Sequence, residues 1–477
     1  MKNFPFSKNN DLLLPIPDNN EPVDYFRMIF DNNILNTIAN ETNHYAEEIF
    51  CSKGVAEHSR ITRWKPVTCN EMLTFIALLL HTGTIKMTRL QDYWRSHPLY
   101  NMKCFSAFMS RDRFLVIMRC LHFVRNPTEG EKSTDRLYKI RPLVNFFNNK
   151  VTELYYPGKQ LALDESMVLW RGRLTFRQYI KNKRHKYGIK LYMLTEPSGL
   201  ILKSLVYTGT LDDCGGKGHT SKVVLALLEN YLDSGHSIYM DNFYNSYELN
   251  RQLTLRGTYC TGTLNAKRKH NPQEVLTRKL KKGESIARYS NNIMIGKWKD
   301  KREVLYISNE HGNEMVEYVD KRNRNREKPS PIFHYNKNMG GVDRQDQLNS
   351  YYPCSRKTLR WYKKLGVHFI QLMLLNSFLL YRKFSGHKIS FYEFRHSVLC
   401  SLLQINVTSQ KKTPSKTNVS KHVLSKIASK AKDGRINRKR CRVCSANKIR
   451  KRTLYHCEKC PEQPGFCVGE CFESAHV

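Results

Sequence analysis

Carboxylates occupy three positions in the chain where their chemistry is informative. Asp164 lies inside an apolar run, where Asp is disfavoured in a strand and a buried carboxylate must be paired or hold a metal. Asp241 ends a second apolar run, at the edge where open α/β sheets place functional groups. Asp343 and Asp346 follow two glycines and share one helical face. If they converge, these carboxylates can bind two Mg²⁺ ions that serve an in-line phosphoryl transfer.

The same acids also allow structural interpretations. The chain holds 42 Asp and Glu residues, so three of them can always be grouped on spacing alone. The spacing leaves two alternatives open: Asp164 is a buried salt-bridge partner, and Asp241 and Asp346 are helix caps.

A basic segment with interleaved aromatic residues follows Asp164 directly. Residues 171–190 hold eight Lys or Arg and no acid, together with Phe176, Tyr179 and Tyr187. Cations pair with phosphates and aromatic rings stack on bases, so the segment is expected to hold a nucleic-acid strand beside the metals. A solvated charged hairpin is the alternative. The cations expected at the nucleic acid are Arg171, Arg173, Arg177, Lys181, Lys183, Arg184 and Lys186.

Residues 441–477 carry a cluster of metal-ligand types. Two Cys-x₂-Cys units and two further cysteines are a strong zinc signal, and seven candidate ligands exceed the four of one site. We expect two structural Zn²⁺ ions in a cross-brace module. The eighth ligand stays open between His456 and a carboxylate such as Glu473, unless the second site is incomplete. One ion is assigned to Cys441, Cys444, Cys467 and Cys471, and the other to Cys457, Cys460 and His476.

The overall charge requires a polyanionic partner. The 477 residues include 79 Lys or Arg against 42 Asp or Glu, a net charge of +37. Membrane surfaces, RNA and DNA all qualify, and nucleic acid ranks first because no basic amphipathic helix stands out. No membrane span is expected, since polar residues interrupt the most apolar stretch, 367–381, which is interpreted as a buried helix. Residues 1–20 lack the apolar segment of a secretory signal.

The elements that must position these residues follow from hydrophobic periodicity. Helices are expected before residue 158, over 72–80, 112–123 and 136–147. Strands are expected over 160–170, 187–195, 200–207, 236–241 and 258–263, with helices over 221–232 and 247–255 between them. This alternation predicts a mixed α/β sheet. Residues 264–334, with strands over 292–298 and 304–308, are interpreted as a basic insertion, residues 336–405 as helical, and residues 411–440 as a flexible basic tether.

The acid-bearing segments resemble the catalytic motifs of piggyBac-type transposases. Residues 163–173 with 186–190 look like the first motif, 239–246 like the second, and 335–347 with 355–361 like the third. The cysteine cluster also has counterparts in that family, and the resemblance runs from about residue 22 to the end.

The resemblance implies a cut-and-paste DNA transposase with an RNase H-like catalytic core, a β-rich insertion and a flanking helical dimerisation and DNA-binding domain. It implies a DDD triad of Asp164, Asp241 and Asp343, with Asp346 close to the Mg²⁺ ions. Excision through hairpin intermediates, integration at TTAA, a homodimer acting on double-stranded DNA in the nucleus, and terminal repeats read by the zinc module are further expectations. Arg356, Lys357 and Arg360 join the expected DNA contacts.

The expected layout is a flexible leader (1–21), a helical domain in two parts (22–158 and 352–405), a catalytic core in two parts (159–263 and 335–351), an insertion (264–334), a basic linker (406–440) and the zinc module (441–477). Two alternatives stay open: a domesticated relative that binds DNA without mobilising it, and a chromatin reader whose zinc module binds histone tails. The short leader is not strongly acidic as in many family members, which leaves regulation open.

Overall fold

Strand β3, which carries Asp164, lies inside a nine-stranded mixed sheet. In the computed structural model the hydrogen-bonded order is β4-β5-β3-β7-β8-β11-β10-β9, with β6 also paired to β5. β3 is antiparallel to β5 and parallel to β7, and β7 is parallel to β8. The strands are β3 (Gln160–Leu169), β4 (Gln178–Tyr179), β5 (Tyr187–Thr195), β6 (Ile201–Val206), β7 (Ser237–Met240), β8 (Tyr259–Thr263), β9 (Ser285–Ser290), β10 (Ile293–Lys299) and β11 (Glu303–Ser308).

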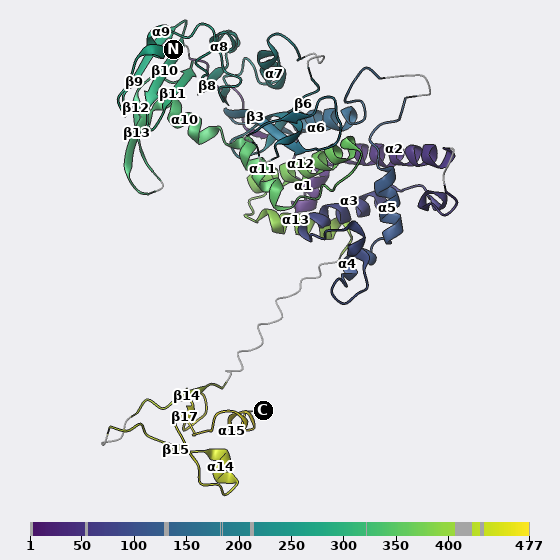
Figure 1. Cartoon of the computed structure of the whole chain (residues 1–477), viewed down its shortest axis with the longest axis vertical. Helices are drawn as coiled ribbons and strands as arrows, with labels where there is room; N and C mark the ends of the chain where they lie inside the picture. The colour runs from purple at the N-terminus through teal and green to yellow at the C-terminus, as the bar shows by residue number, and fades with distance from the viewer. Residues whose placement is uncertain are drawn as a thin grey trace. The chain divides into compact units, whose positions relative to one another are not determined.

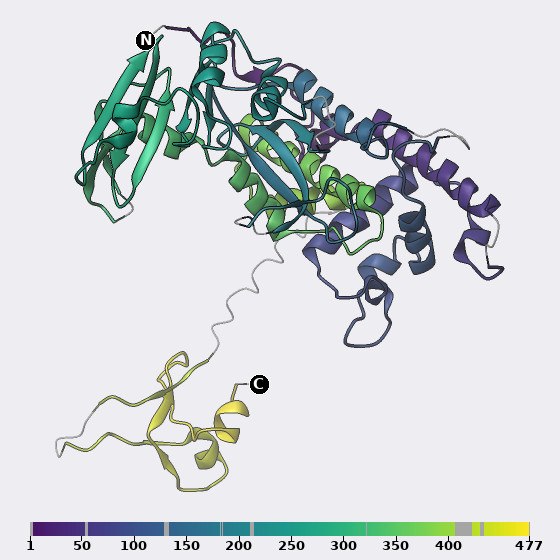
Figure 2. The ribbon, with the colours of Figure 1, turned by 45° about the horizontal axis from the view of Figure 1, so that its top comes forward.

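The structure describes residues 3–52, 56–127, 133–181, 183, 185–209, 214–320, 322–405, 422–429 and 434–476. The chain divides into two units, residues 1–405 and 406–477. Figures 1 and 2 show the first unit with its β-rich segment β9–β13 at one end, the helices α2, α3 and α5 at the other, and β3 and α11 between them.

The segment 264–334 is β-rich, but its first strands are not separate from the core sheet. β11 pairs antiparallel with β8, Tyr306 opposite Thr263, so β11, β10 and β9 continue the same hydrogen-bonded sheet. A second hairpin, β12 (Met315–Val319) and β13 (Asn325–Pro329), follows them. β9, β12 and β13 were not predicted from the sequence, because charged and polar residues cover their exposed faces and hide the alternation.

The helices come from both sides of the core and share one apolar interior. α12 is apolar and long enough to cross a membrane, but 89% of its most apolar window is buried inside the protein, as expected for a core helix. Thr68 caps α3 by accepting a hydrogen bond from Glu71 N, where the capping spacing predicts a helix start. The main helices are α1 (Pro22–Ile29), α2 (Asn32–Cys51), α3 (Cys69–Thr84), α5 (Arg111–Cys120), α6 (Arg141–Leu154), α7 (His219–Leu228), α8 (Tyr247–Leu255), α10 (Ser330–Asn338), α11 (Gly341–Tyr351), α12 (Trp361–Phe384) and α13 (Phe391–Leu402).

Two asparagines cover the outer edge of β6. Asn376 of α12 accepts from Ile201 N at 3.0 Å and donates to Ile201 O at 2.7 Å. Asn148 of α6 does the same with Ser204, at 2.8 and 2.9 Å. Each side-chain amide thus replaces the backbone groups of a missing neighbouring strand.

The N-terminal leader is not loose, contrary to the expectation for residues 1–21. β1 (Asp11–Leu12) pairs with β2 (Tyr155–Tyr156). The ring of Phe4 lies 5.0 Å from that of Tyr259, and Phe6 lies 4.9 Å from His236. These aromatic contacts join residues distant in sequence, so the polar local composition could not reveal them.

The C-terminal module begins before residue 441, so the expected linker over 406–440 is wrong in its second half. β14 (Leu424–Lys426) pairs with β17 (Tyr455–Cys457), and β15 (Lys439–Arg440) pairs with β16 (Arg452–Thr453). Backbone pairing of this kind is compatible with a basic composition, because the charged side chains point outward. Residues 406–421 and 430–433 lie outside the described residues.

Gly262 tests the packing at the end of β7. A Cβ there would lie 1.8 Å from Met240 O and 2.4 Å from Asn245 Nδ2. We expect Gly262→Ala to lower the free energy of unfolding by about 1–3 kcal/mol, because the strand ahead of Asp241 must move. Gly340→Ala is the matched control, since an added Cβ there meets nothing within 4 Å. Equal thermal denaturation curves for the two variants would show that the end of β7 tolerates the added methyl group.

Candidate active site and metal centre

Two of the four acids lie side by side where the parallel pairing of β3 with β7 ends. Leu163 of β3 is the register partner of Met240 of β7, and Asp164 and Asp241 are the next residues along each chain. Asn245 fixes the turn after β7 by donating to Met240 O at 2.8 Å. Asp241 Oδ1 accepts from the backbone of this turn at 2.9 Å. The first and second motifs therefore meet beside the last paired residues of β3 and β7.

Helix α11 brings the third motif to the same place. Ser166, two residues after Asp164 and so on the same face of β3, donates to Asp346 Oδ1 at 2.6 Å. Asp343 is exposed on the first turn of α11, three residues before Asp346. Among the residues that the structure describes, no three of these core carboxylates have oxygens all within 4.8 Å of one another.

Burial makes these carboxylates hold protons tightly. Burial, followed by the Glu165 and Asp241 charges, raises the pKa of Asp164 to about 7. Burial also raises the pKa of Asp346 to about 6 and moves the pKa of Asp241 upward. A set of half-buried oxygen donors with raised pKa values suits a hard divalent cation such as Mg²⁺, whose charge would restore the ionised forms.

Lys183, expected to contact DNA, lies within the carboxylate cluster. Its Nζ donates to Glu165 O at 2.7 Å and lies 3.4 Å from Asp164 Oδ2 and 3.8 Å from Glu165 Oε1. In the sequence Lys183 belongs to a basic run, whereas in the structure its ammonium lies beside the carboxylates of Asp164 and Glu165. Contact of Lys183 with a DNA phosphate stays a prediction, and in this structure its partners are Asp164 and Glu165.

Three residues close to Asp164 were not predicted from the sequence: Glu165, Ser166 and Lys190. Glu165 accepts from Tyr244 Oη at 3.1 Å and lies 3.9 Å from Lys190 Nζ. The Lys190 ammonium in turn lies over the rings of Tyr192 and Phe243. Ser166 could have been found from strand alternation, whereas the partners of Glu165 come from separate elements and leave no local signal.

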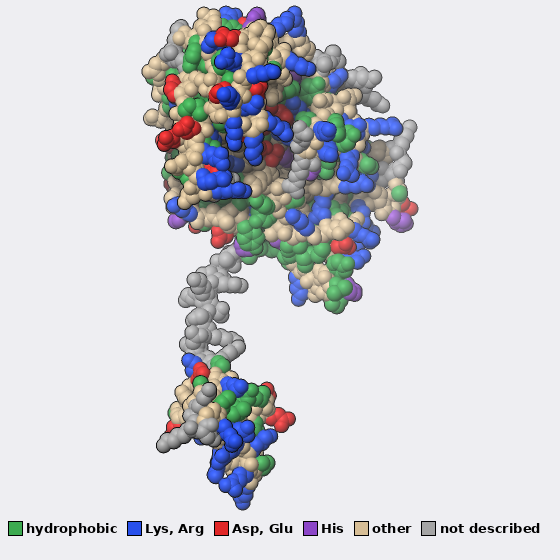
Figure 3. Space-filling view, turned by 60° about the vertical axis from the view of Figure 1, so that its left-hand side comes forward, with side chains coloured by type: hydrophobic (Ala, Val, Ile, Leu, Met, Phe, Trp, Pro, Cys, Tyr) green, Lys and Arg blue, Asp and Glu red, His purple; other side chains and the backbone are tan. Residues whose placement is uncertain are grey.

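The remaining expected DNA contacts differ in exposure. Arg356 is half-buried and donates to Met87 O and to the Tyr93 hydroxyl, so it contacts the helical core, and its binding to DNA stays a prediction. Arg184 lies outside the described residues. Figure 3 shows Lys and Arg side chains gathered on one face of the molecule. The exposed cations are Arg171, Arg173, Arg177, Lys181, Lys186, Lys357 and Arg360.

The first metal group of the C-terminal unit matches the expected assignment. Cys441, Cys444, Cys467 and Cys471 have their sulfur atoms within 4.8 Å of one another. Cys444 Sγ lies 3.6 Å from Cys471 Sγ and 3.9 Å from Cys467 Sγ. Tetrahedral Zn²⁺ with Zn–S bonds of about 2.3 Å needs sulfur separations of about 3.8 Å, so the group fits zinc.

The second metal group supplies the missing ligand, His422. Its Nδ1 lies 3.3 Å from both Cys457 Sγ and Cys460 Sγ, and His476 Nε2 lies 3.1 Å from Cys460 Sγ. His476 Nδ1 lies 2.8 Å from Phe472 O, which leaves Nε2 to face the metal position. His456 and Glu473, the expected candidates for the eighth ligand, belong to neither group.

Comparisons with known proteins agree with the motifs. The family described as "Transposase IS4" matches residues 21–378. The human PiggyBac transposable element-derived protein 3 is 26% identical over 465 residues, covering 92% of this chain and 74% of that protein. The human PiggyBac transposable element-derived protein 2 is 28% identical over 417 residues, covering 82% and 67%.

A solved structure shares the fold. It is described as a piggyBac transposase synaptic complex with hairpin DNA. Its TM-score is 0.71 at 23% identity, over 97% of this chain and 99% of that chain.

The raised pKa of Asp164 predicts a pH-dependent stability. The folded chain holds this proton up to about pH 7, against 3.8 for an ordinary Asp, so the free energy of unfolding falls as pH rises between these values. In Mg²⁺-free buffer, Asp164→Asn should melt above the wild type at pH 8, and the gap should shrink toward pH 4. Asp112 is the control, because hydrogen bonds from Arg111 and Arg60 lower its pKa. Asp112→Asn should therefore not stabilise the protein. A gap that widens on acidification would refute the assignment.

His422 predicts the zinc content of the full chain. We expect the wild type to carry two Zn²⁺ ions and His422→Ala to lose the one held by Cys457, Cys460 and His476. His456→Ala should retain both, because this imidazole lies outside the group. Elemental analysis of the purified proteins measures the ratio. Two zinc ions in His422→Ala, or a loss in His456→Ala, would overturn the ligand set.

Proposed function

Because the chain belongs to the piggyBac-type transposase family, we propose that it is a DNA transposase that cuts and joins strands by metal-dependent phosphoryl transfer. The family match spans all four acids and confirms the resemblance drawn from the three motifs. One observation carries the proposal. Asp164 and Asp241 lie where the pairing of β3 with β7 ends, and the acids of α11 come to the same place through the bond from Ser166 to Asp346.

We propose that the catalytic core is RNase H-like. The antiparallel strands β3, β5 and β6, with the short β4 between β3 and β5, are followed in the chain by α7, β7, α8 and β8. β7 and β8 run parallel to β3. This order supports the proposal because the first acid stands on the first strand and the second acid follows the first parallel strand.

Each carboxylate has its own part in the proposed chemistry. Asp164, Asp241 and Asp343 would hold two Mg²⁺ ions, and Asp346, held by Ser166, would orient the third motif. When bound, the ions would activate the attacking hydroxyl and stabilise the leaving oxygen. Lys183 balances the acids until a cation binds, because its ammonium already lies among them.

The further steps of the proposed cut-and-paste cycle are inferred from membership of the family. We propose excision through hairpin intermediates, integration at TTAA, and a homodimer that works on double-stranded DNA in the nucleus. The net charge of +37 supports a DNA partner. The exposed cations after β3 would hold the strand at the acids, and the zinc module would contact the terminal repeats.

A second candidate is a domesticated DNA-binding protein. It is favoured by the two human relatives, both described as derived from transposable elements. Inverted terminal repeats flanked by TTAA around the gene would favour the active transposase, and their absence the domesticated protein. A chromatin reader is the third candidate, tested by binding of histone peptides to the full chain.

Asp241→Asn tests the catalytic proposal. The variant should still bind a terminal-repeat duplex, because the basic surface is unchanged, but should nick it at least about 1,000-fold more slowly, since a metal ligand is lost. Gel assays of nicking and binding measure both properties. Asp233→Asn is the matched control, because Asp233 forms an exposed ion pair with Arg256 away from the acids. Wild-type nicking by Asp241→Asn would rule out its role as a metal ligand.

A further inference from the structure

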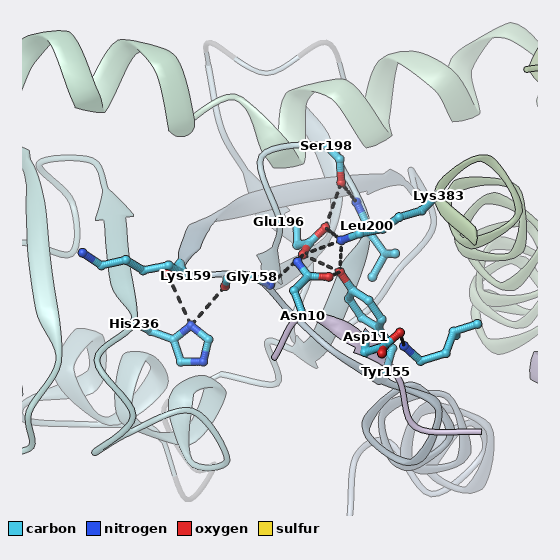
Figure 4. Close-up of polar contacts among 11 residues, drawn as sticks. Asn10, Asp11, Tyr155, Gly158, Lys159, Glu196, Ser198, Leu200, His236 and Lys383 are labelled. Atoms are coloured by element: carbon cyan, nitrogen blue, oxygen red, sulfur yellow. Dashed lines mark hydrogen bonds and ion pairs between the residues drawn. The ribbon is translucent and has the colours of Figure 1, made fainter. Parts of the chain in front are cut away.

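The buried carboxylate of Glu196 lies where four distant segments of the chain meet (Figure 4). Its Oε1 accepts hydrogen bonds from Tyr155 Oη at 2.5 Å, Gly158 N at 2.9 Å and Asn10 Nδ2 at 3.2 Å. Lys383 Nζ, at the end of α12, lies 3.3 Å from both carboxylate oxygens. Glu196 is 6% exposed. A buried charge with this many donors has its desolvation offset and its position fixed.

Glu196 also begins the tight turn between β5 and β6. Ser198 Oγ donates to its Oε2 at 3.3 Å, and Gly199 N donates to its carbonyl oxygen at 3.0 Å. Gly199 has a φ of 99°, which L side chains rarely adopt. The 196–199 turn is therefore held through both the side chain and the backbone of Glu196.

The first turn of α11 lies directly on the 196–199 turn. A Cβ on Gly341 would stand 2.2 Å from Thr195 Oγ1 and 2.4 Å from Glu196 O, so the two backbones touch. The Arg344 guanidinium donates to Pro197 O. These contacts surround Asp343, which is two residues after Gly341 and one before Arg344.

The same junction fixes the start of β3. Gly158, whose N–H bonds to Glu196, is two residues before Gln160, the first residue of β3. His236 Nδ1 holds the other side of this segment, 3.1 Å from Gly158 O and 3.3 Å from Lys159 O. Glu196 thus connects the strand that carries Asp164 with the turn beneath the acids of α11.

We propose that Glu196 is a positioning residue for the metal-binding carboxylates of α11, and that the N-terminal segment contributes through Asn10. This inference rests on the proposed function, because it concerns the same metal site. Mg²⁺ needs near-ideal octahedral geometry with oxygen distances of about 2.0–2.1 Å, so a small shift of α11 against β3 weakens binding. The partners of the Glu196 carboxylate are Tyr155, Gly158, Asn10, Ser198 and Lys383 and include none of the four acids, so Glu196 acts through the turn.

Direct binding of Mn²⁺ to the full-length chain, followed by electron paramagnetic resonance, tests the proposal. Glu196→Gln keeps the shape of the side chain but replaces an acceptor oxygen with an NH₂ group that faces the donors. We expect its Kd for Mn²⁺ to rise about tenfold or more, as for other residues that support metal ligands. Asn10→Ala, which removes one hydrogen bond to the carboxylate and one from the Tyr155 hydroxyl, should shift the Kd in the same direction by a smaller factor.

Glu229→Gln is the matched control, since Glu229 forms an exposed pair with Lys203 of β6 at 3.1 Å and does not contact α11. A nicking assay across Mg²⁺ concentrations separates positioning from general damage. Glu196→Gln should need more Mg²⁺ for its half-maximal rate but approach the wild-type rate at saturation. A rate lowered equally at every Mg²⁺ concentration, with unchanged Mn²⁺ affinity, would overturn the positioning role.

Asp343→Asn separates the metal site itself from the role of Glu196. If it binds Mn²⁺ as the wild type does, the proposed metal site is wrong. If it loses binding while folded Glu196→Gln and Asn10→Ala keep wild-type affinity, the metal site stands and the role of Glu196 is refuted. Should Glu196→Gln not fold, Asn10→Ala decides, because Asn10 is at the surface and its loss leaves the carboxylate four other donors.

Discussion

The register of β3 is the constraint on which the rest of the structure depends. This strand is hydrogen-bonded on both sides, with Asp164 opposite Met193 of β5 and Leu163 opposite Met240 of β7. A slip of one residue would turn Asp164 to the opposite face and move Ser166 away from Asp346. Pairing with β5 and β7 prevents such a slip. Asp164 and Asp241 therefore stay next to each other, although burial makes their ionisation unfavourable.

Around this strand, helices from before and after the sheet form a single interior. The ring of Tyr25 in α1 lies 5.2 Å from that of Tyr381 in α12, edge to face. The buried Arg395 of α13 donates to Leu80 O of α3 at 2.8 Å. The helical segments separated by about two hundred residues of sheet therefore stabilise each other, and neither is expected to hold its shape alone.

The local pattern of apolar residues was sufficient to predict the helices and strands in which those residues repeat regularly. The strand expected over 160–170 is β3, the one over 187–195 is β5, and the helix over 247–255 is α8. The paired cysteines likewise predicted the grouping of the first zinc site. These signals are local, and burial of one face is enough to produce them.

Features that depend on contacts between distant residues could not be predicted. His422 lies among basic residues well before Cys441, the first cysteine of the C-terminal cluster, so its place in the second metal group comes from β14 pairing with β17. The anchoring of the N-terminal segment depends on Tyr259 and Glu196. Lys183 and Arg356 belong to basic runs that look like DNA contacts, and their acid or carbonyl partners become visible only in three dimensions.

The covered edge of β6 has a consequence for biosynthesis. Asn148 precedes β6 in the chain and is already present when β6 is made, but Asn376 is added 175 residues after Ile201. During that interval the backbone of Ile201 has no partner, and an open strand edge can recruit strands from other nascent chains. The edge of β6 is therefore expected to close late in folding, with chaperones shielding it until α12 docks.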